Sequence, residues 1–332
     1  MVSWGIAGCG WIARDHAAPA MTSVVALLSP NAADRARMPV QPAVSTDDLE
    51  VFLRAPIDAV YVATPNDTHR SLVEACAAAG LPILCEKPMA TTLDDAQAMV
   101  GACERAGVAY ATAHNQRWHP AHTRLRELVA DGTIGAVRQA RIHYACTAPA
   151  WWGADDWHWD PARAGGGALF DLAPHGLDLV AMLLDAELEE VTAMTQGDGP
   201  VEEGAILLAR YGGDVLLTLQ VSYACPETLP RRRLELVGTA GMVVAENTMG
   251  QAPGGTLTLI DADDGVPRDV AFDTTGDPFA LQIAAFERLV AGEPWPWPVA
   301  RDLTVMAAID ASSRRFTAPA AATRHVDAET TA

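Results

Sequence analysis

The stretch Gly5-Ile6-Ala7-Gly8-Cys9-Gly10-Trp11-Ile12-Ala13 decides the fold of this chain. An apolar run precedes its glycines and a helical pattern follows them, so the sequence predicts a strand at 2–7, a tight turn and a helix at 12–20. Glycine allows the backbone to turn sharply and to approach a pyrophosphate, which would bind at the start of the helix. The stretch therefore predicts a dinucleotide site formed by Gly8, Gly10, Trp11 and Ile12.

Outward from this stretch, short apolar runs alternate with helical patterns as far as residue 113. Strands are predicted at 24–28, 59–63, 82–85 and 108–113, and helices at 47–54, 68–79 and 91–106. We expect Ser45 or Thr46 to cap the short helix at 47–54. Strands and helices that alternate in this way predict a Rossmann-type, doubly wound parallel sheet with helices on both faces.

Beyond residue 120 the pattern changes. Helices are predicted at 119–131, from 168 to about 184, at 278–291 and at 303–316, and a frayed tail at 317–332. Strands are predicted at 137–144, 190–195, 205–210, 215–221, 234–237, 242–245 and 256–260. Because no long crossover helices separate the strands after residue 188, we expect a mainly antiparallel open sheet in an α+β domain. The sequence thus predicts a dinucleotide-binding domain at 1–118 and a substrate-binding and oligomerisation domain at 119–332.

Charge and composition narrow the function. The formal net charge is −19, which disfavours nucleic acid and anionic membranes as partners. We find no run of eighteen apolar residues and no secretory signal, so the sequence predicts neither a membrane span nor export. The six cysteines are scattered without a CxxC pair, which favours free thiols in a reducing cytoplasm. No metal site is predicted.

The residue after the second predicted strand is expected to meet the adenosine ribose. It is Ser29, which offers neither a carboxylate for the 2′-hydroxyl of NAD nor a positive charge for the 2′-phosphate of NADP. Asp34 and Arg35 follow one turn later and favour opposite cofactors. Because the turn itself offers no cation, the sequence favours NAD and leaves NADP open.

Three further strand ends bring polar residues to the edge of the sheet where ligands of open α/β sheets bind. They carry Thr64, Pro65, Asn66 and His69, then Glu86 and Lys87, and then Asn115, Arg117 and Trp118. His69 has a second interpretation as a helix-start residue. Lys87 is the only lysine among 23 basic residues, and an ammonium, unlike a guanidinium, changes its pKa readily with burial. Lys87 is therefore the candidate for handling protons, unless an arginine-rich composition left it there by chance.

The glycine-rich stretch 165–178 carries a second group. Asp171 and His175 are four residues apart and share one face if the stretch is helical, although Pro174 leaves that geometry open. An Asp that orients a His is the usual support of a general base. A His that is simply buried and hydrogen-bonded on a core helix is the alternative.

Four of the nine tryptophans lie between residues 151 and 160, a stretch that includes Trp157 and His158. Indole faces stack on apolar faces of ligands and on cations. The carboxylates of Asp155, Asp156 and Asp160 could accept from hydroxyl or ammonium groups. A plug between domains or subunits is the competing interpretation of this aromatic stretch.

As a set, these motifs resemble the glucose-fructose oxidoreductase / inositol dehydrogenase / rhizopine catabolism (Gfo/Idh/MocA) family. The matching residues are Gly5–Gly10, Ala63-Thr64-Pro65-Asn66 with His69, Cys85-Glu86-Lys87-Pro88-Met89-Ala90, Asn115 with Arg117-Trp118, and Gly165–His175. They follow one another in order over the first 180 residues. One departure is Trp157-His158, which stands where family members often have Trp-Arg before the triple glycine.

The resemblance implies an NAD(P)-dependent oxidoreductase that transfers a hydride between the nicotinamide and a ring hydroxyl of a sugar, amino sugar or cyclitol. It implies that His175 takes the hydroxyl proton, and that Lys87 hydrogen-bonds the reacting oxygen and, with Asp171, tunes His175. Glu86 would contact the ribose on the nicotinamide side. The expected substrate contacts are Trp118, Trp157, His158, Asp171 and His175.

Two other functions fit the same motifs. One is a glycoside-cleaving enzyme that keeps and recycles its NAD, and the other is a non-catalytic regulator that senses the cofactor. An intact Lys87–Asp171–His175 set argues against the regulator. The acidic composition adds the hypothesis of a cationic substrate such as an aminoglycoside. The antiparallel sheet, with Arg231-Arg232-Arg233 on a solvated or intersubunit face, predicts a homodimer or homotetramer.

Overall fold

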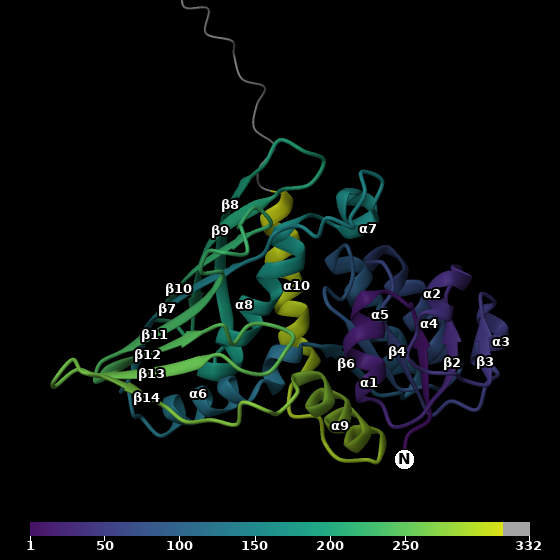
Figure 1. The fold of residues 1–332 in the computed structure, drawn as a ribbon, viewed down its shortest axis with the longest axis horizontal. Helices are drawn as coiled ribbons and strands as arrows, with labels where there is room; N and C mark the ends of the chain where they lie inside the picture. Colours follow the sequence, from purple (N-terminus) through teal and green to yellow (C-terminus); the bar gives the residue numbers. More distant parts are fainter. Residues whose placement is uncertain (315–332) are drawn as a thin grey trace, which may run out of the picture.

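The computed structural model describes residues 1–314, which form two domains side by side, each built on one sheet (Figure 1). The first sheet has six strands in the order β3-β2-β1-β4-β5-β6. These strands are β1 (Trp4–Ala7), β2 (Val24–Leu28), β3 (Val44–Thr46), β4 (Ala59–Val62), β5 (Ile83–Glu86) and β6 (Tyr110–Ala113). Every pairing between them is parallel, which confirms the predicted Rossmann sheet.

Helical segments connect these strands. They are the π-helical turn η1 (Ala13–Ala17), α1 (Ala18–Ala20), α2 (Ala32–Ala36), α3 (Leu49–Leu53), the 3₁₀ turn η2 (Asn66–Thr68), α4 (His69–Ala78) and α5 (Leu93–Ala106). α5 follows a Thr92 cap and ends at Gly107, which has a left-handed conformation with φ 65°. The carboxyl ends of all six strands therefore meet at one edge, where the predicted site residues lie.

The second sheet has eight strands in the order β14-β13-β12-β11-β7-β10-β9-β8. They are β7 (Val137–Ala145), β8 (Leu188–Gln196), β9 (Gly204–Tyr211), β10 (Val215–Ser222), β11 (Arg232–Gly238), β12 (Gly241–Glu246), β13 (Thr256–Asp261) and β14 (Pro267–Asp269). Only the pairing of β7 with β10 is parallel among these strands. The prediction of a mainly antiparallel sheet is thus confirmed.

Helices cover one face of this sheet and separate it from the first domain (Figure 1). They are α6 (Pro120–Ala130), α8 (Ala168–Leu184) and α10 (Val299–Arg314), with shorter turns η3 (Asn115–Trp118), η4 (Trp157–Trp159) and α7 (Pro161–Ala164). The segment 161–184 is long and apolar enough to cross a membrane, but 89% of its apolar 18-residue window is buried inside the molecule. This burial identifies α8 as the core helix of the second domain.

The chain returns to the first domain near its C-terminus. α9 (Pro278–Val290) places Phe286 against the ring of Trp4 in β1, with ring centroids 5.6 Å apart. The indole Nε1 of Trp4 also donates a hydrogen bond of 3.0 Å to Glu287. α10 then packs on α8 and on α5, so it contacts both domains. A helix from the far end of the sequence thus completes the core of the first domain.

Several local predictions differ from the structure. The short helix α3 is capped by Asp48, whose carboxylate accepts from the N–H groups of Glu50 and Val51, and not by Ser45 or Thr46. Those two residues belong instead to β3, a strand too short to leave an alternating pattern. The short elements α2 and β14 were also not predicted. α10 begins at Val299, whereas the sequence analysis placed its start at residue 303 and so missed the first turn of this helix. The predicted helix end at 316 and the tail at 317–332 lie outside the described residues.

Candidate active site

The glycine turn after β1 has the shape that a dinucleotide requires. Gly8 has φ 96°, and a Cβ there would lie 2.2 Å from the carbonyl oxygen of Ala63, so the turn passes directly against the end of β4. A Cβ on Gly10 would meet nothing within 4 Å, so the space beside this residue is open. Trp11 borders the turn, with 40% of its surface exposed. The first helical segment begins directly after this turn, and the N–H groups at the start of a helix are those that bind a pyrophosphate, which favours the predicted site.

The ribose-reading turn after β2 contains a cation that the sequence analysis did not expect. Ser29 is buried, and its hydroxyl accepts from the N–H of Asn31. The guanidinium of Arg35 folds back and donates to the carbonyl oxygen of Ser29. The expectation that this turn lacks a positive charge was therefore wrong, because the first turn of α2 returns Arg35 to it.

Lys87 and Asp171 form an ion pair between the two domains. Lys87 follows β5, and its Nζ lies 2.5 Å from Oδ1 of Asp171 in the first turn of α8. The same ammonium donates to the backbone carbonyl of Asp171 at 3.1 Å. Burial lowers the pKa of Lys87, but Asp171 outweighs it and the pKa is raised above its usual 10.5. Burial raises the pKa of Asp171, whereas Lys87 lowers it, to about 2. Both groups are charged at neutral pH.

His175 lies one turn further along α8 and is 5% exposed. Burial and then the nearby ammonium of Lys87 lower the pKa of its imidazole well below 6.5, and the opposing effect of Asp171 is smaller. Its ring packs edge-on against Tyr144 of β7, with centroids 5.5 Å apart, and its Nδ1 has no hydrogen-bond partner among residues 1–314. The imidazole is therefore neutral at neutral pH and able to accept a proton.

The partner of Asp171 differs from the one expected. The sequence spacing favoured an Asp that orients His175, yet one carboxylate oxygen of Asp171 binds Lys87 and the other accepts 3.0 Å from the hydroxyl of Tyr223. Tyr223 follows β10, and its ring contacts Trp152 and Trp159. No signal in the sequence pointed to this tyrosine, because the contact joins residues 52 positions apart.

Glu86 is the last residue of β5 and is almost fully buried. The hydroxyl of Tyr61 in β4 donates to its Oε1, and the N–H of Lys87 donates to its Oε2 at 3.2 Å. Burial raises the pKa of Glu86, although Tyr61 and Lys87 oppose this. Tyr61 therefore fixes the carboxylate that was expected to contact the nicotinamide-side ribose.

Two of the residues predicted to bind the cofactor, His69 and Asn66, mainly join chain segments. His69 is fully buried, with Nε2 2.9 Å from the carbonyl of Thr64 and Nδ1 3.1 Å from that of Met89. Asn66 donates from Nδ2 to the carbonyl of Ala164 in α7 at 2.9 Å. The contacts of His69 favour its alternative role, which is to hold the loop after β4, with Pro65, against the loop that carries Lys87.

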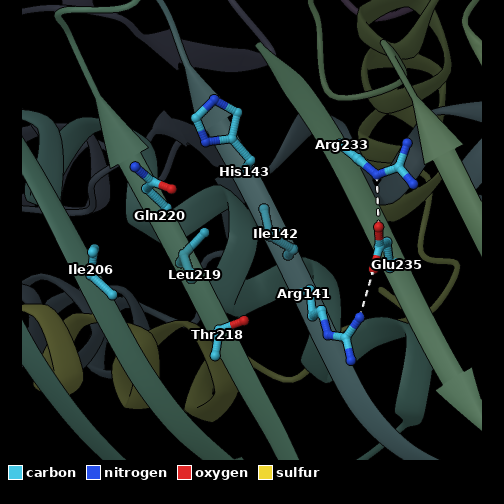
Figure 2. Close-up of a pocket in the computed structure, with 9 residues that line it drawn as sticks. All are labelled: Arg141, Ile142, His143, Ile206, Thr218, Leu219, Gln220, Arg233 and Glu235. Atoms are coloured by element: carbon cyan, nitrogen blue, oxygen red, sulfur yellow. Dashed lines mark hydrogen bonds and ion pairs between the residues drawn. The ribbon is translucent and has the colours of Figure 1, made fainter. Parts of the chain in front are cut away.

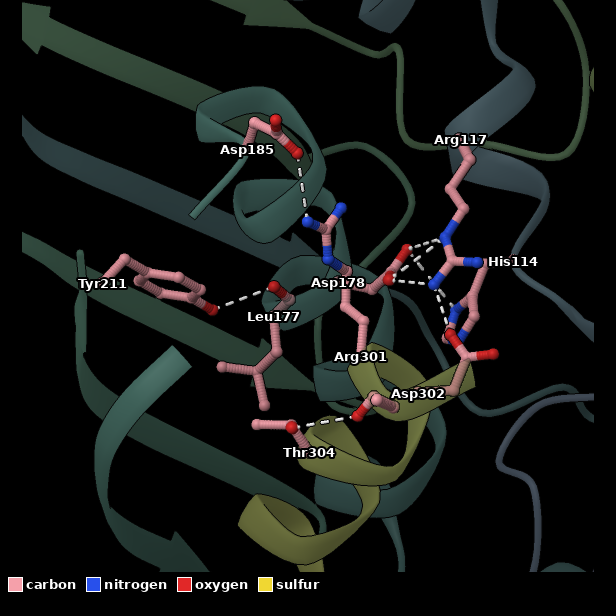
Figure 3. Close-up of polar contacts among 10 residues, drawn as sticks. His114, Arg117, Leu177, Asp178, Asp185, Tyr211, Arg301, Asp302 and Thr304 are labelled. Atoms are coloured by element: carbon pink, nitrogen blue, oxygen red, sulfur yellow. Dashed lines mark hydrogen bonds and ion pairs between the residues drawn. The ribbon is translucent and has the colours of Figure 1, made fainter. Parts of the chain in front are cut away.

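Arg117 and Asn115, both predicted to contact the cofactor, are buried at the junction between the domains. The guanidinium of Arg117 binds Asp178 of α8, with Nε 2.9 Å from Oδ2, and also binds Asp302 of α10 (Figure 3). Burial raises the pKa of Asp178, but Arg117 outweighs it and the pKa is lowered. These contacts favour a structural role for Arg117 over the predicted cofactor contact.

His114, Asp178 and Asp302 lie close enough together to hold a metal ion. The guanidinium of Arg117 already pairs with both carboxylates and supplies the positive charge that an ion would bring. Burial lowers the pKa of His114, which leaves this imidazole neutral beside them. The cluster is therefore internally compensated, and we assign no metal to it.

The aromatic residues predicted to contact substrate separate into two places. His158 lies flat between Trp152 and Trp157, with centroid distances of 3.7 and 3.8 Å, and its Nδ1 is 2.5 Å from Oδ1 of Asp156. Because Trp152 also contacts Tyr223, this stack borders Asp171. Trp118 instead packs against Trp295 at 5.4 Å, beside the junction, which does not support its predicted substrate contact.

Comparison with known proteins agrees with this geometry. Residues 2–114 match the model of the oxidoreductase family with an NAD-binding Rossmann fold, and residues 122–244 match the GFO/IDH/MocA C-terminal domain. The chain belongs to the Gfo/Idh/MocA family. Like other Gfo/Idh/MocA members, it is an NAD(P)-dependent oxidoreductase of the sugar and cyclitol dehydrogenase type.

Two curated Gfo/Idh/MocA relatives illustrate the range. The chain is 31% identical to 1,5-anhydro-D-fructose reductase of Ensifer adhaerens over 93% of its own length and 96% of the relative. It is 32% identical to D-xylose 1-dehydrogenase (NADP(+)) 2 of Haloferax volcanii over 77% of each chain. The solved aldose-aldose oxidoreductase of Caulobacter crescentus has the same fold, with a TM-score of 0.83, 24% identity and coverage of 94% of this chain and 96% of that one.

Proposed function

We propose that this enzyme interconverts a ring hydroxyl and the corresponding ketone of a sugar-like substrate, with His175 as the general base. The observation that carries the proposal is the neutral, buried imidazole of His175 beside the charged Lys87–Asp171 pair at the carboxyl edge of the Rossmann sheet. A bound nicotinamide cofactor would supply the hydride chemistry. The protein must then hold the substrate and move one proton.

Each residue of the site has a distinct role in this proposal. His175 accepts the hydroxyl proton at an imidazole nitrogen, and its low pKa keeps it unprotonated for this step. The ammonium of Lys87 remains charged and donates a hydrogen bond to the reacting oxygen, which stabilises negative charge there. Asp171 holds Lys87 in place and keeps its proton on it. The three groups therefore act as a base, a charged donor and the carboxylate that fixes the donor.

The substrate is a small polyhydroxylated ring. The stack of Trp152, His158 and Trp157 offers flat apolar faces, and the Tyr223–Asp171–Lys87 group offers polar ones beside it. Formation or consumption of the reduced nicotinamide should be measured with 1,5-anhydro-D-fructose and D-xylose, after which the two relatives above are named, and with D-apiose, myo-inositol and levoglucosan, after which other similar dehydrogenases are named. Turnover of a glycoside without net change in nicotinamide absorbance would replace this proposal with the cofactor-recycling glycoside cleavage. Cofactor binding without any turnover would support the regulator.

The hypothesis of a cationic substrate loses part of its support. Asp156 binds His158, and Asp160 caps α7 by accepting from the N–H of Ala162, so both carboxylates have local partners. Of the three carboxylates, only that of Asp155 has no described hydrogen bond of this kind. Asp155 and the net charge of −19 are the remaining support for a cationic substrate. A neutral sugar that reacts as well as its amino analogue would remove the hypothesis.

The preference between NAD and NADP depends on the turn after β2. We retain NAD as the proposal because the guanidinium of Arg35 already donates to the carbonyl oxygen of Ser29, although the same guanidinium could instead pair with a 2′-phosphate. Comparing kcat/KM for NAD and NADP, in the wild type and in Arg35→Ala, decides between them. A preference for NADP that disappears in the variant would overturn the proposal.

We also propose that the uncovered face of the second sheet joins two copies of the chain in the cytoplasm. Exposed apolar side chains gather on this face at Ile206, Leu208 and Leu216. A shallow hollow beside Ile206 is lined by charges of both signs, including Arg141, Arg233 and Glu235 (Figure 2). A face of mixed charge can pair with itself around a two-fold axis. Light scattering of the wild type and of Leu208→Glu tests it, and a wild-type monomer would refute it.

A further inference from the structure

Glu202 lies at the start of the helix that carries Asp171 and His175. It belongs to the segment 197–203 between β8 and β9, far from both residues in sequence. Its Oε1 accepts from the N–H of Gly167 at 2.7 Å and from the N–H of Leu169 at 2.9 Å. Its own carbonyl oxygen accepts from the N–H of Ala168 at 3.0 Å. One residue therefore satisfies three of the free N–H groups that begin α8.

The last glycine of the triple glycine is explained by this contact. A Cβ on Gly167 would lie 1.9 Å from the carbonyl oxygen of Glu202, which no side chain could tolerate. Glu202 and Gly167 are thus in backbone contact. α8 also has no side-chain cap of its own at Gly167, so Glu202 takes the place of an N-cap residue.

The same segment reaches Asp171 by a second route. The carbonyl oxygen of Glu203 accepts from the N–H of Tyr223 at 2.8 Å. The hydroxyl of Tyr223 then donates to Oδ2 of Asp171 at 3.0 Å. The N–H of Asp171 itself donates to the carbonyl of Gly167 at 3.0 Å, in the turn that Glu202 holds. Both the backbone and the carboxylate of Asp171 therefore depend on residues 202 and 203.

We propose that Glu202 is a positioning residue that holds the start of α8 so that Asp171 meets Lys87. The inference rests on the proposed function for its catalytic meaning, although its geometry stands without it. A negative carboxylate at the positive end of a helix is electrostatically favourable, which adds to the three hydrogen bonds. A glutamate in the β8–β9 segment thus acts on the site through Asp171, which contacts Lys87.

The single lysine of the chain makes a direct test possible. Lysine labelled with ¹³C at its ε carbon gives one side-chain NMR signal, and the dependence of this signal on pH reports the pKa of Lys87 without substrate. The wild-type pKa is expected above the usual 10.5 because Asp171 is in contact. In Glu202→Ala the start of α8 loosens, Asp171 moves away from Lys87, and the pKa falls because burial then acts with less opposition.

Matched variants separate positioning from general destabilisation. Glu203→Ala removes the same charge one residue away, where the side chain is exposed, and should titrate like the wild type. Glu202→Gln keeps an oxygen that can accept from Gly167 and Leu169, and should restore most of the wild-type titration. If the sugar panel identifies a substrate, kcat of Glu202→Ala should fall about tenfold while its KM for the cofactor is unchanged.

The outcomes are distinguishable. A lower melting temperature of Glu202→Ala with an unchanged Lys87 titration would mean that Glu202 is only structural, and the inference would be overturned. A shifted titration with no turnover of any sugar by the wild type would keep the positioning role and refute the proposed function. If Glu202→Ala does not fold, Tyr223→Phe keeps the ring between Trp152 and Trp159 and removes the hydroxyl. Its Lys87 titration must then shift in the same direction for the inference to hold.

Discussion

Replacing Arg117 by leucine tests whether this residue joins the domains or binds the cofactor. The side chain is fully buried and pairs with Asp178 and Asp302, so the variant leaves two buried carboxylates without their partner. Breaking a buried ion pair from one side costs about 3–5 kcal/mol, because the remaining charge stays desolvated. Urea unfolding at neutral pH should show a loss of this size. The affinity for NAD, measured on the folded fraction, should change little.

The pH dependence of this loss gives a second check. In the wild type Arg117 lowers the pKa of Asp178, so the stability contributed by this carboxylate is present above its ordinary pKa of 3.8 and is lost as the pH falls through the lowered value. Without Arg117, burial raises the pKa of the carboxyl, and the folded variant gains protons and stability as the pH falls towards 3.8. The difference between wild type and variant should therefore be largest at neutral pH and should narrow in acid.

The neighbouring Arg126 provides the control for both measurements. Its guanidinium lies over the ring of Trp297, 5.0 Å from the ring centroid, but the described residues show no carboxylate bound to this guanidinium. Arg126→Leu should cost about 1 kcal/mol or less. A loss from Arg117→Leu that is no larger, or that does not depend on pH, would refute the structural role. A loss of NAD affinity without a loss of stability would restore the predicted cofactor contact.

Three further predictions concern the site itself. Lys87→Arg keeps the charge but replaces the compact ammonium that is proposed to bind the reacting oxygen by a larger, planar guanidinium, so kcat should fall about a hundredfold or more while the Kd for the cofactor is retained. Normal turnover of the variant would show that a compact ammonium is not needed at this position. Gly10→Ala should leave the melting temperature unchanged, because its Cβ meets no described atom within 4 Å, but it should weaken cofactor binding. Gly8→Ala should lower the free energy of unfolding by about 1–3 kcal/mol. Equal effects of the two variants on stability would be inconsistent with the predicted pyrophosphate site at this turn. The rate of alcohol oxidation, plotted against pH, should show no inflection near pH 6.5, because the pKa of His175 is well below that value. Lys87→Met should move the inflection to higher pH, because the ammonium that lowers the pKa of His175 is removed. An inflection at pH 6.5 in the wild type would contradict the neutral imidazole.

The sequence was a sound guide wherever the chemistry depends on neighbours along the chain. The turn at Gly8, the strand end at Lys87 and the i, i+4 spacing of Asp171 and His175 are local, and the structure brings all of them to one edge. The alternation of strands and helices predicted the parallel sheet, and its central strands β1, β4 and β5 are buried on both faces, as such a sheet requires.

Prediction was weaker where a role depends on the direction in which a side chain points. His69 and Arg117 follow the right strands but turn into the protein, where carbonyls and carboxylates bind them. Arg35 lies one helical turn beyond the ribose-reading residue, and only the fold of α2 returns it there. Tyr223 and Glu202 lie in loops that follow strands of the second sheet, and they contact α8 only in the folded protein. No spacing in the sequence could therefore place them next to α8. These contacts are tertiary, and pattern alone does not encode them.

The return of α9 to the first domain has a mechanical consequence. The polypeptide crosses between the two halves after η3, again before α9 and once more before α10, while α10 itself touches both halves. Two domains that are joined by several chain segments cannot rotate freely about a single linker. We therefore expect any movement of one domain relative to the other to be a small hinge motion. The same tethers imply that residues 1–118 expressed alone would expose the apolar surface that Phe286 and Ile283 cover, and a freely folding fragment would have to include α9.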